Sequence, residues 1–263
     1  MAKSISYNSF DLQNSYFRTK DIIYRNFPEK IIDLEPNARR DGFRLQNTYY
    51  DKKDIIISGT LTRDTEANLK ISLDSMKEAL HSDEAALDID DGGTTIRYIC
   101  SVDSISVPEE HYNITRIPYK IVFRCQPFGH ATTGVTSTNS INSTPFETTI
   151  NPTGSAPPLP TLKWTCDGSP TAAITQIVFN NTTTGDSITV PSLALDADGD
   201  YLIIDTDAMT VKRSYDGGAE TSIDFTGVFP TFNATSNSYS VSIVGGGATW
   251  ALDQVIEYYS AYL

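Results

Sequence analysis

One segment of the 263-residue chain has the clear apolar spacing of an amphipathic helix, whereas the rest reads as short apolar runs. The residues of this stripe recur at spacings of four, three and four, which puts their side chains on one helical face. They are Leu69, Leu73, Met76 and Leu80. Asp64 or Thr65 can cap the start, because a short oxygen-bearing side chain accepts the free backbone N–H groups. We predict a helix over about residues 65–80, whose stripe is core, with a partner groove as the alternative.

Segments with the two-residue period of β-strands surround this helix. The predicted strands of this part of the chain are residues 55–57, 86–89, 95–102 and 117–125. In the last of them Lys120 and Arg124 lie on the polar face. Cys100 and Cys125 fall on apolar faces, so we interpret them as buried small hydrophobic residues. With three Cys, three His and no paired spacing, neither a disulfide framework nor a structural zinc site is expected.

From residue 160 onward the sequence contains no helical stripe. The apolar runs are short and are separated by turn signals such as Asp167-Gly168 and Gly245-Gly246-Gly247. The segment from Trp250 to Leu263 is expected to close the chain as a last strand. Many short strands with such turns indicate an all-β domain, either a β-sandwich or a jelly roll. The predicted fold class is therefore mainly β, with an α+β N-terminal domain that contains one helix.

Charge is unevenly distributed along the chain. Up to residue 130 the chain holds 17 Lys+Arg and 20 Asp+Glu, and the remainder holds 3 and 13, which together give the net charge of −13. Because residues 131–160 are rich in Thr, Ser, Asn and Pro, we predict an N-terminal domain at 1–130, a linker at 131–150 and a C-terminal domain at 151–263.

An acidic chain disfavours duplex binding through a basic patch. No apolar run reaches the ~18 residues of a membrane helix, and the start lacks a secretory signal.

No motif for nucleophilic catalysis or for a nucleotide cofactor is present in the sequence, so we expect neither an enzyme nor a cofactor. The three histidines, His81, His111 and His130, are interpreted as solvated or structural. The run Asp196-Ala-Asp198-Gly-Asp200 invites a calcium interpretation. However, Tyr201 stands where an EF-hand loop needs Gly, which favours an acidic turn and no metal.

Exposed aromatic side chains on a β-sandwich can stack on sugar rings. Among the aromatic residues of the second half, Trp164 and Trp250 are the candidates that we select for sugar stacking. A place in the core is the alternative for each of them. The other aromatic residues considered are Tyr201, Tyr215 and Phe232.

The order of these segments resembles a known family. Four stretches of the first half form a strand, helix, strand, strand, strand series: DIIISGTLTRDTEANLKISLDSMKEAL, AALDID, TIRYICSVDSISV and RIPYKIVFRCQPFG. Four stretches of the second half follow: FETTINPTGSAPPLPTLKW, ITQIVFNNTTTGDSITV, GDYLIIDTDAMTVKRSYDG and FTGVFPTF. Together they span most of residues 50–263 and resemble the distal tail (Dit) proteins of long-tailed bacteriophages. The first 50 residues match only loosely.

The resemblance implies a tail-tube-like N-terminal domain followed by a galectin-like or carbohydrate-module-like β-sandwich. It also implies a structural virion protein, assembled in the host cytoplasm, whose hexameric ring joins the tail tube protein to the tail-tip or baseplate hub protein. No catalytic, cofactor or metal residue is implied. The alternative function is a β-sandwich module that binds host cell-surface saccharide, and a glycan hydrolase is a third. Residues 22–24 and 31–34 are expected to form strands or an arm that wraps the adjacent subunit.

The implied ring leaves a channel for DNA, and residues 95–107 and 116–126 are the expected channel strands. The candidate channel or ring-interface residues are Arg97, Lys120 and Arg124. A conduit must let DNA slide, and an acidic protein meets that need through like-charge repulsion. We therefore expect Lys120 and Arg124 to pair with acidic residues of neighbouring strands or subunits.

Overall fold

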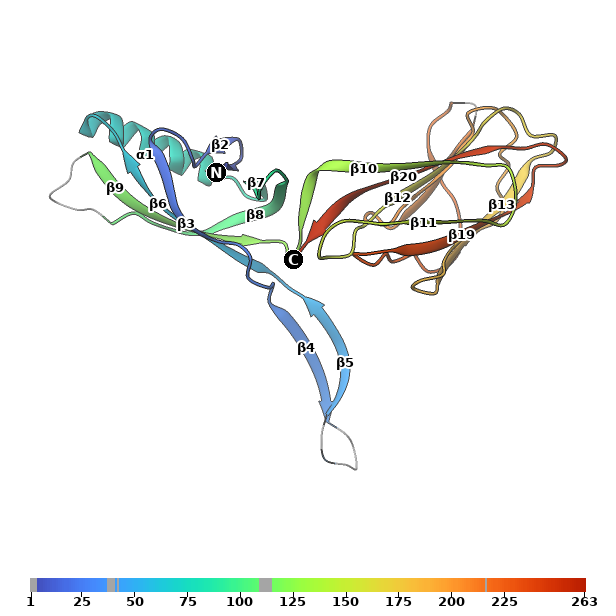
Figure 1. Ribbon diagram of the computed structural model, residues 1–263, viewed down its shortest axis with the longest axis horizontal. Coiled ribbons are helices and arrows are strands. Elements are labelled where there is room, and N and C mark those ends of the chain that lie inside the picture. The colour runs from blue at the N-terminus through green and yellow to red at the C-terminus, as the bar shows by residue number, and fades with distance from the viewer. Residues whose placement is uncertain (1–3, 37–40, 42, 109–114, 216) are drawn as a thin grey trace. The chain divides into compact units, whose positions relative to one another are not determined.

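The computed structural model describes residues 4–36, 41, 43–108, 115–215 and 217–263. The chain divides into two compact units, Met1–Thr132 with Tyr262–Leu263, and Thr133–Ala261 (Figure 1). It therefore passes into the second unit inside one strand, β10 (Gly129–Ile141), and returns inside another, β20 (Leu252–Tyr262).

The first unit is built on an antiparallel sheet with the strand order β3-β6-β9-β8-β7-β1-β2. Its strands are β1 (Ile5–Tyr7), β2 (Phe10–Asp11), β3 (Phe17–Ile23), β6 (Lys53–Thr62), β7 (Ala85–Asp90), β8 (Thr95–Ser106) and β9 (Arg116–Cys125). The strands predicted at 55–57, 86–89, 95–102 and 117–125 lie within β6, β7, β8 and β9, and they are confirmed. Residues 22 and 23 belong to β3, which among the described strands pairs with β6 alone.

Helix α1 (Glu66–Leu80) confirms the predicted helix. Thr65 is its N-cap, since its Oγ1 accepts a hydrogen bond from the backbone N–H of Asn68 at 3.2 Å. The apolar stripe faces the core of this unit, where Leu69, Met76 and Leu80 are buried. The stripe is therefore part of the fold and does not form a partner groove.

Cys100 and Cys125 form a disulfide bond, which corrects the prediction that they are unbonded small hydrophobic residues. They lie directly opposite each other on β8 and β9, with Cα atoms 3.9 Å apart, and both are buried. The 25-residue separation reveals nothing about this contact until the two strands are paired in register. Cys166 is free and buried, and burial raises the pKa of its thiol to about 12.

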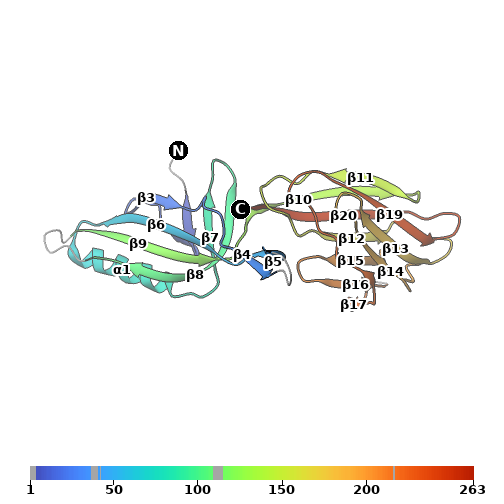
Figure 2. The same ribbon diagram turned by 90° about the horizontal axis from the view of Figure 1, so that it is seen from below.

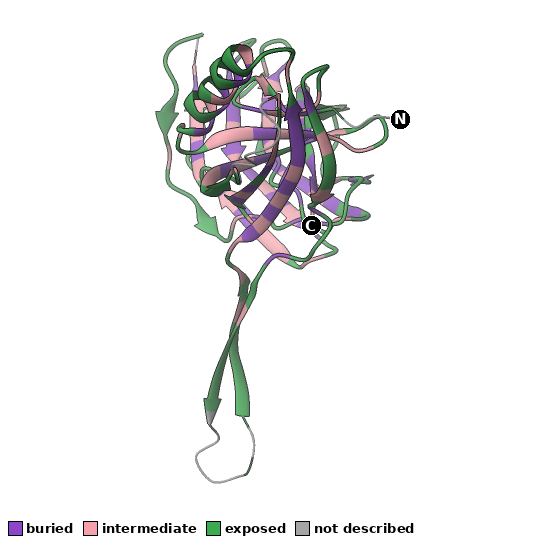
Figure 3. Cartoon of the chain, turned by 90° about the vertical axis from the view of Figure 1, so that its left-hand side faces the viewer, coloured by how far each residue is buried: buried purple, intermediate pink, exposed green. Residues whose placement is uncertain are grey.

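A separate two-stranded hairpin, β4 (Lys30–Pro36) with β5 (Phe43–Tyr50), follows β3. Residues 31–34 are therefore in a strand, as one of the two interpretations expected. Figure 3 shows the described part of the hairpin extending from the sheet of the first unit with mostly exposed residues. Several of its large apolar side chains are exposed, namely Ile32, Leu34, Phe43, Leu45 and Tyr49.

The second unit is a β-sandwich, as predicted. One sheet has the order β17-β16-β15-β12-β20-β10, and the other has the order β11-β19-β13-β14-β18 (Figure 2). The remaining strands are β11 (Phe146–Ile150), β12 (Thr161–Cys166), β13 (Ile174–Asn181), β14 (Asp186–Val190), β15 (Tyr201–Asp205), β16 (Thr210–Ser214), β17 (Thr221–Ser222), β18 (Thr226–Gly227) and β19 (Asn237–Gly245). An aromatic cluster lies between the sheets, where the Phe179 ring contacts those of Trp164, Phe232 and Tyr239.

The linker predicted at 131–150 is wrong, because β10 and β11 occupy most of this segment. The Thr and Ser residues of this segment favour a connector by composition, but Thr is also a good strand former when one face of the strand is solvated. β10 lies beside β20, and β11 pairs with β19. Buried Ile141 and Ile150 anchor the ends of the two strands in the core.

Candidate functional site

The open face of the first unit's sheet holds the charged residues expected in a channel or ring interface. Side chains alternate along β6, β8 and β9, so the inward ones, such as Ile57 and Phe123, are buried in the core that includes α1. The outward ones form rows across the sheet that the strand register defines. One row runs through Asp54, Arg124 and Ser101, and another through Ser58, Lys120 and Ser106.

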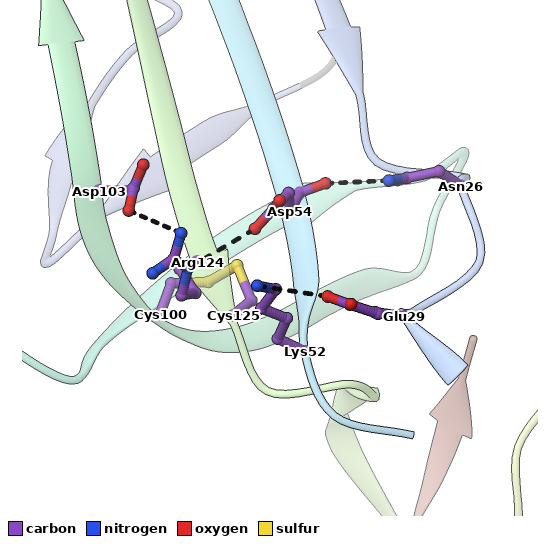
Figure 4. Close-up of polar contacts among 8 residues, drawn as sticks. All are labelled: Asn26, Glu29, Lys52, Asp54, Cys100, Asp103, Arg124 and Cys125. Carbon is purple, nitrogen blue, oxygen red and sulfur yellow. Dashed lines mark hydrogen bonds and ion pairs between the residues drawn. A yellow bond between two sulfur atoms is a disulfide. The ribbon is translucent and has the colours of Figure 1, made fainter. Parts of the chain in front are cut away.

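Arg124 pairs with acids on both neighbouring strands, as expected (Figure 4). Its Nη2 lies 2.9 Å from Asp103 Oδ1 on β8, and its Nε lies 3.9 Å from Asp54 Oδ1 on β6. A register irregularity between Val102 and Ser104 inserts Asp103 as an extra residue on β8. The Arg124 side chain is 52% exposed, so these ion pairs neutralise its charge but add little stability.

Lys120 lies in a row of small polar residues, between Ser58 and Ser106, and is exposed. Asp21 of β3 lies opposite Ser58 in the same register. Within the described residues Lys120 makes no ion pair. The expected pairing of Lys120 with a neighbouring strand is therefore not formed inside this part of the chain, and a pairing with another subunit stays a prediction.

Arg97 is held in a two-point ion pair at the other end of β8. Its Nε and Nη2 each donate to a carboxylate oxygen of Asp88 on β7, both at 2.8 Å. Arg97 and Asp88 lie opposite each other in the β7–β8 register. These hydrogen bonds raise the pKa of the Arg97 guanidinium, so its charge is fixed and locally compensated.

The base of the β4–β5 hairpin is fastened by contacts that the sequence did not reveal (Figure 4). Glu29 N donates to Lys52 O at 2.7 Å, and Lys52 Nζ lies 3.2 Å from Glu29 Oε2. Asn26 Nδ2 donates to Asp54 O at 3.1 Å, which ties the chain entering the hairpin to the strand that leaves it. These contacts fix where the hairpin starts, while its apolar residues beyond the base stay exposed.

Lys53, immediately after the hairpin, is an unforeseen buried cation. Its side chain is 1% exposed, and its Nζ donates to the Tyr98 hydroxyl at 3.4 Å and lies 5.0 Å from the Tyr98 ring centre. Burial lowers the pKa of Lys53 to about 8 and raises that of Tyr98 to about 12. Lys52 and Lys53 look alike in sequence, but Lys52 precedes β6 and is partly exposed, whereas Lys53 is the first residue of β6 and is buried.

The second unit does not present Trp164 for sugar stacking. Trp164 has no exposed surface and packs against Phe179, so that candidate is wrong. Its position on the inward face of β12 explains the burial. Trp250 is half-buried against the core of the sandwich, and a stacking role for it stays a prediction.

The acidic run at 196–200 folds as a turn. Asp200 Oδ2 accepts hydrogen bonds from the backbone N–H groups of Asp196 and Ala197, and Asp198 Oδ1 accepts one from Gly168. In the described ranges, no three His, Cys, Asp or Glu side chains come together as a group that could hold a metal ion. No helix in the same ranges is long and apolar enough to cross a membrane.

The histidines do not form a shared site where they are described. His81 is the C-cap of α1, with its backbone N–H donating to Glu78 O at 3.2 Å. His130 lies on β10 opposite Arg97. His111 lies outside the described residues.

No protein-family model and no curated protein matches this chain. Among solved structures, it is similar to SPP1 Dit, from the hub adsorption apparatus of phages that infect Gram-positive bacteria. The TM-score is 0.72 at 15% identity, and the match covers 100% of both chains. Two phage P2 baseplate structures in the activated conformation, with Ca and with Sr, match at TM-scores of 0.47 and 0.46, with 8% and 9% identity; they cover 97% of this chain and 98% and 97% of theirs. The resemblance expected from the sequence is confirmed for the fold: the chain has the fold of a Dit hub protein.

Proposed function

We propose that this chain is a structural protein of a bacteriophage tail tip. In this role it forms a hexameric ring that joins the tail tube protein to a tail-tip or baseplate hub protein, and it leaves a channel for DNA. The observation that carries the proposal is the fold similarity to SPP1 Dit over the full length of both chains. A β-sandwich alone is shared by many unrelated binding and catalytic domains, whereas a match that spans both units is more specific. The protein breaks no covalent bond and resides in the virion.

The hairpin β4–β5 supports assembly between copies. Its register puts Leu34 opposite Leu45, and Phe43 lies two residues before Leu45 on the same strand, so these large apolar side chains gather on one face. Leu34, Leu45 and Phe43 are 54%, 58% and 67% exposed, which is unfavourable for a surface that stays in water. In a cyclic ring each copy presents one surface and accepts a different one. We assign the hairpin as the surface that each copy presents to its neighbour.

The open face of the sheet supports a conduit that does not hold DNA. DNA binding rises with each phosphate that a free Lys or Arg neutralises. Arg124 and Arg97 are each compensated by carboxylates of adjacent strands, which leaves them little net attraction for phosphate. The strands 95–107 and 116–126 therefore stay our candidates for the channel wall, with Lys120 at a contact between subunits.

Native mass spectrometry of the full chain tests the ring. We expect a hexamer, or a pair of stacked hexamers, for the wild type. The double variant Leu34→Asp with Leu45→Asp is expected to be monomeric with an unchanged circular dichroism spectrum. Ile71→Asp is the matched control, because Ile71 is 62% exposed on α1 and lies outside the hairpin. A wild type that stays monomeric at every concentration and is absent from assembled particles would overturn the proposal.

A further inference from the structure

A row of buried residues crosses the sheet of the first unit where β6 begins and β9 ends. Lys53 of β6 lies opposite Cys125 of β9, which in turn lies opposite Cys100 of β8. The disulfide bond joins the two cysteines of this row (Figure 4). Lys53, Cys125 and Cys100 are 1%, 3% and 2% exposed, so a cation and two sulfur atoms share one environment that excludes water.

The Lys53 ammonium makes no ion pair among the described residues. Its hydrogen bond goes to the hydroxyl of Tyr98, and it also lies over the Tyr98 ring. Burial, and then the nearby Tyr24 and Asp91, raise the pKa of Tyr98 to about 12, so this hydroxyl is uncharged near neutral pH. A charge is costly to bury without a counter-charge. The disulfide-bonded chain therefore keeps a cation without the anion that would balance it.

The other groups around the row do not supply this anion. The Tyr7 hydroxyl donates to the Cys100 carbonyl at 3.2 Å, and burial raises the pKa of Tyr7, so it also stays neutral. Asp54 and Arg124 lie on the opposite, open face of the sheet. The buried residues of α1, which faces the same core, do not ionise, and they are Leu69, Ser72, Met76 and Leu80.

Reduction of the disulfide would supply the missing anion. A free cysteine thiol has a pKa of about 8.5, and a neighbouring cation lowers this pKa because it favours the thiolate. Opposite residues of an antiparallel pair have Cβ atoms about 4.5–5.5 Å apart, and the flexible Lys stem lets its ammonium turn toward a sulfur atom there. Lys53 faces Cys125 directly, whereas Cys100 is one strand further away. The thiolate of the reduced chain is therefore expected on Cys125.

We propose that Cys100 and Cys125 form a reversible redox site, in which the Lys53 ammonium stabilises the Cys125 thiolate of the reduced chain. The co-reactant is a low-molecular-weight thiol. Its thiolate attacks Cys100 Sγ, the protein S–S bond breaks, and Cys125 leaves as the thiolate, since the more stable thiolate leaves faster. A second small thiol then attacks the small-molecule sulfur of the mixed disulfide and releases Cys100.

This reaction balances in electrons and protons. The two small thiols give two electrons to the protein disulfide and become one small-molecule disulfide. Of the two protons that they lose, one goes to Cys100 and the other to solvent, while Lys53 keeps its own. The site uses only the first unit's sheet and goes beyond the ring proposed above, so neither proposal depends on the other.

The place of the row at the ends of two strands gives a small thiol access. β9 ends at Cys125 and β6 begins at Lys53. The end of a strand opens locally at a lower free-energy cost than the whole fold. Cys166 provides a contrast, because it also ends a strand, β12, but burial and then nearby acidic residues raise the pKa of its thiol to about 12.

Equilibration of the full chain with reduced and oxidised glutathione tests the site, and alkylation followed by mass spectrometry counts the free thiols. Every chain carries Cys166→Ala, so that only the two cysteines of the row react. The folded chain should be reduced by glutathione, and Lys53→Met should lower the equilibrium constant for reduction about tenfold or more. Lys52→Met is the matched control and should leave the constant unchanged, because Lys52 is partly exposed and pairs with Glu29.

Single-cysteine variants test which sulfur atom carries the charge. In Cys100→Ser the remaining Cys125 thiol should ionise below the usual thiol pKa, because it faces Lys53. In Cys125→Ser the remaining Cys100 thiol should ionise above that pKa, because it is buried and farther from the cation. The ultraviolet absorbance of the thiolate measures both values, and circular dichroism confirms that each variant is folded.

Three outcomes would each overturn the proposal. They are an unchanged equilibrium constant in Lys53→Met, a Cys125 thiol that ionises no more readily than Cys100, and a disulfide that glutathione reduces only in denaturant. If Lys53→Met misfolds, the comparison of the two single-cysteine variants still tests the role of the cation. None of these outcomes bears on ring formation, which native mass spectrometry measures separately.

Discussion

Helix α1 and hairpin β4–β5 each carry an apolar stripe, but only the helix buries it within the chain. Leu69, Met76 and Leu80 of the helix are 4%, 0% and 3% exposed, whereas Leu34 and Phe43 of the hairpin are 54% and 67% exposed. The helix stripe therefore stabilises the fold of one copy, whereas we propose that another copy covers the hairpin stripe. Apolar patterning alone does not distinguish a residue that builds the monomer from one that builds the assembly.

The largest expected effect tests the buried side of this comparison. Met76→Ala removes a fully buried side chain from the core of the first unit and should lower the free energy of unfolding by about 2–5 kcal/mol. Urea unfolding followed by circular dichroism measures the loss. Met76→Leu is the control, since a volume-conserving change should cost less than about 1.5 kcal/mol. Equal effects of the two variants would mean that the helix stripe is not tightly packed.

A second prediction concerns the polar residues where the hairpin joins the sheet. The pKa of Lys53 is about 8 in the folded chain, against a usual value of 10.5. Between these pH values the unfolded chain holds a proton that the folded chain has released, so stability should rise with pH in this window. Below it, Lys53→Met should be more stable than the wild type by up to about 3 kcal/mol.

The measurement for Lys53 is the unfolding free energy between pH 6 and about 10.5, where Lys53→Met should lose the rise. Lys52→Met is the control because Lys52 is partly exposed and pairs with Glu29. A slope that persists in Lys53→Met would assign the pH dependence to another group.

A smaller effect is expected on the open face of the sheet. Arg124→Ala removes ion pairs to Asp103 and Asp54 from a half-exposed site and should cost about 1 kcal/mol or less. The loss should shrink in high salt, because salt screens exposed charges. The unfolding free energy at low and at high ionic strength measures both the loss and its salt dependence. A large loss that salt does not change would indicate that the Arg124 stem supports packing rather than charge pairing.

The smallest effect on the monomer, within about 0.5 kcal/mol, is expected from Leu34→Ala in the hairpin. The assembly should respond more strongly. The unfolding midpoint of the wild type should rise with protein concentration, as for any associating protein, and that of Leu34→Ala should rise less. A monomer strongly destabilised by Leu34→Ala would show that the hairpin contributes to the fold of its own chain, and the contrast with α1 would fail.

Local periodicity was enough to predict the elements that depend on their own residues. The helix at 65–80 and the strand at 117–125 follow from apolar spacing, and Thr65, one of the two caps that the sequence allows, is the N-cap. The linker prediction for 131–150 fails because the strands of this segment are polar on their solvated face and are buried by neighbouring strands on the other. Residues that depend on their neighbours in this way are the ones for which composition misleads.

Of the candidate site, the sequence predicts only the ion pairing of Arg124 with adjacent strands. The sequence predicts that Arg124 pairs with an acidic residue of a neighbouring strand. It does not show that Asp103 is this residue, because Asp103 contacts Arg124 through a register irregularity in β8. The Cys100–Cys125 bond depends on the register between two strands that are separated in sequence. The Trp164 candidate is wrong because the sequence does not show which face of β12 points into the core.

The exposed hairpin has a consequence for mixtures of chains. In the ring proposed here, a copy that lacks β4–β5 would still accept the hairpin of one neighbour but would offer nothing to the next. Such a copy would terminate a growing arc instead of merely failing to join it. A minority of hairpin-deleted chains should therefore prevent intact chains from closing the ring. This makes the hairpin a suitable target for a dominant inhibitor of particle production.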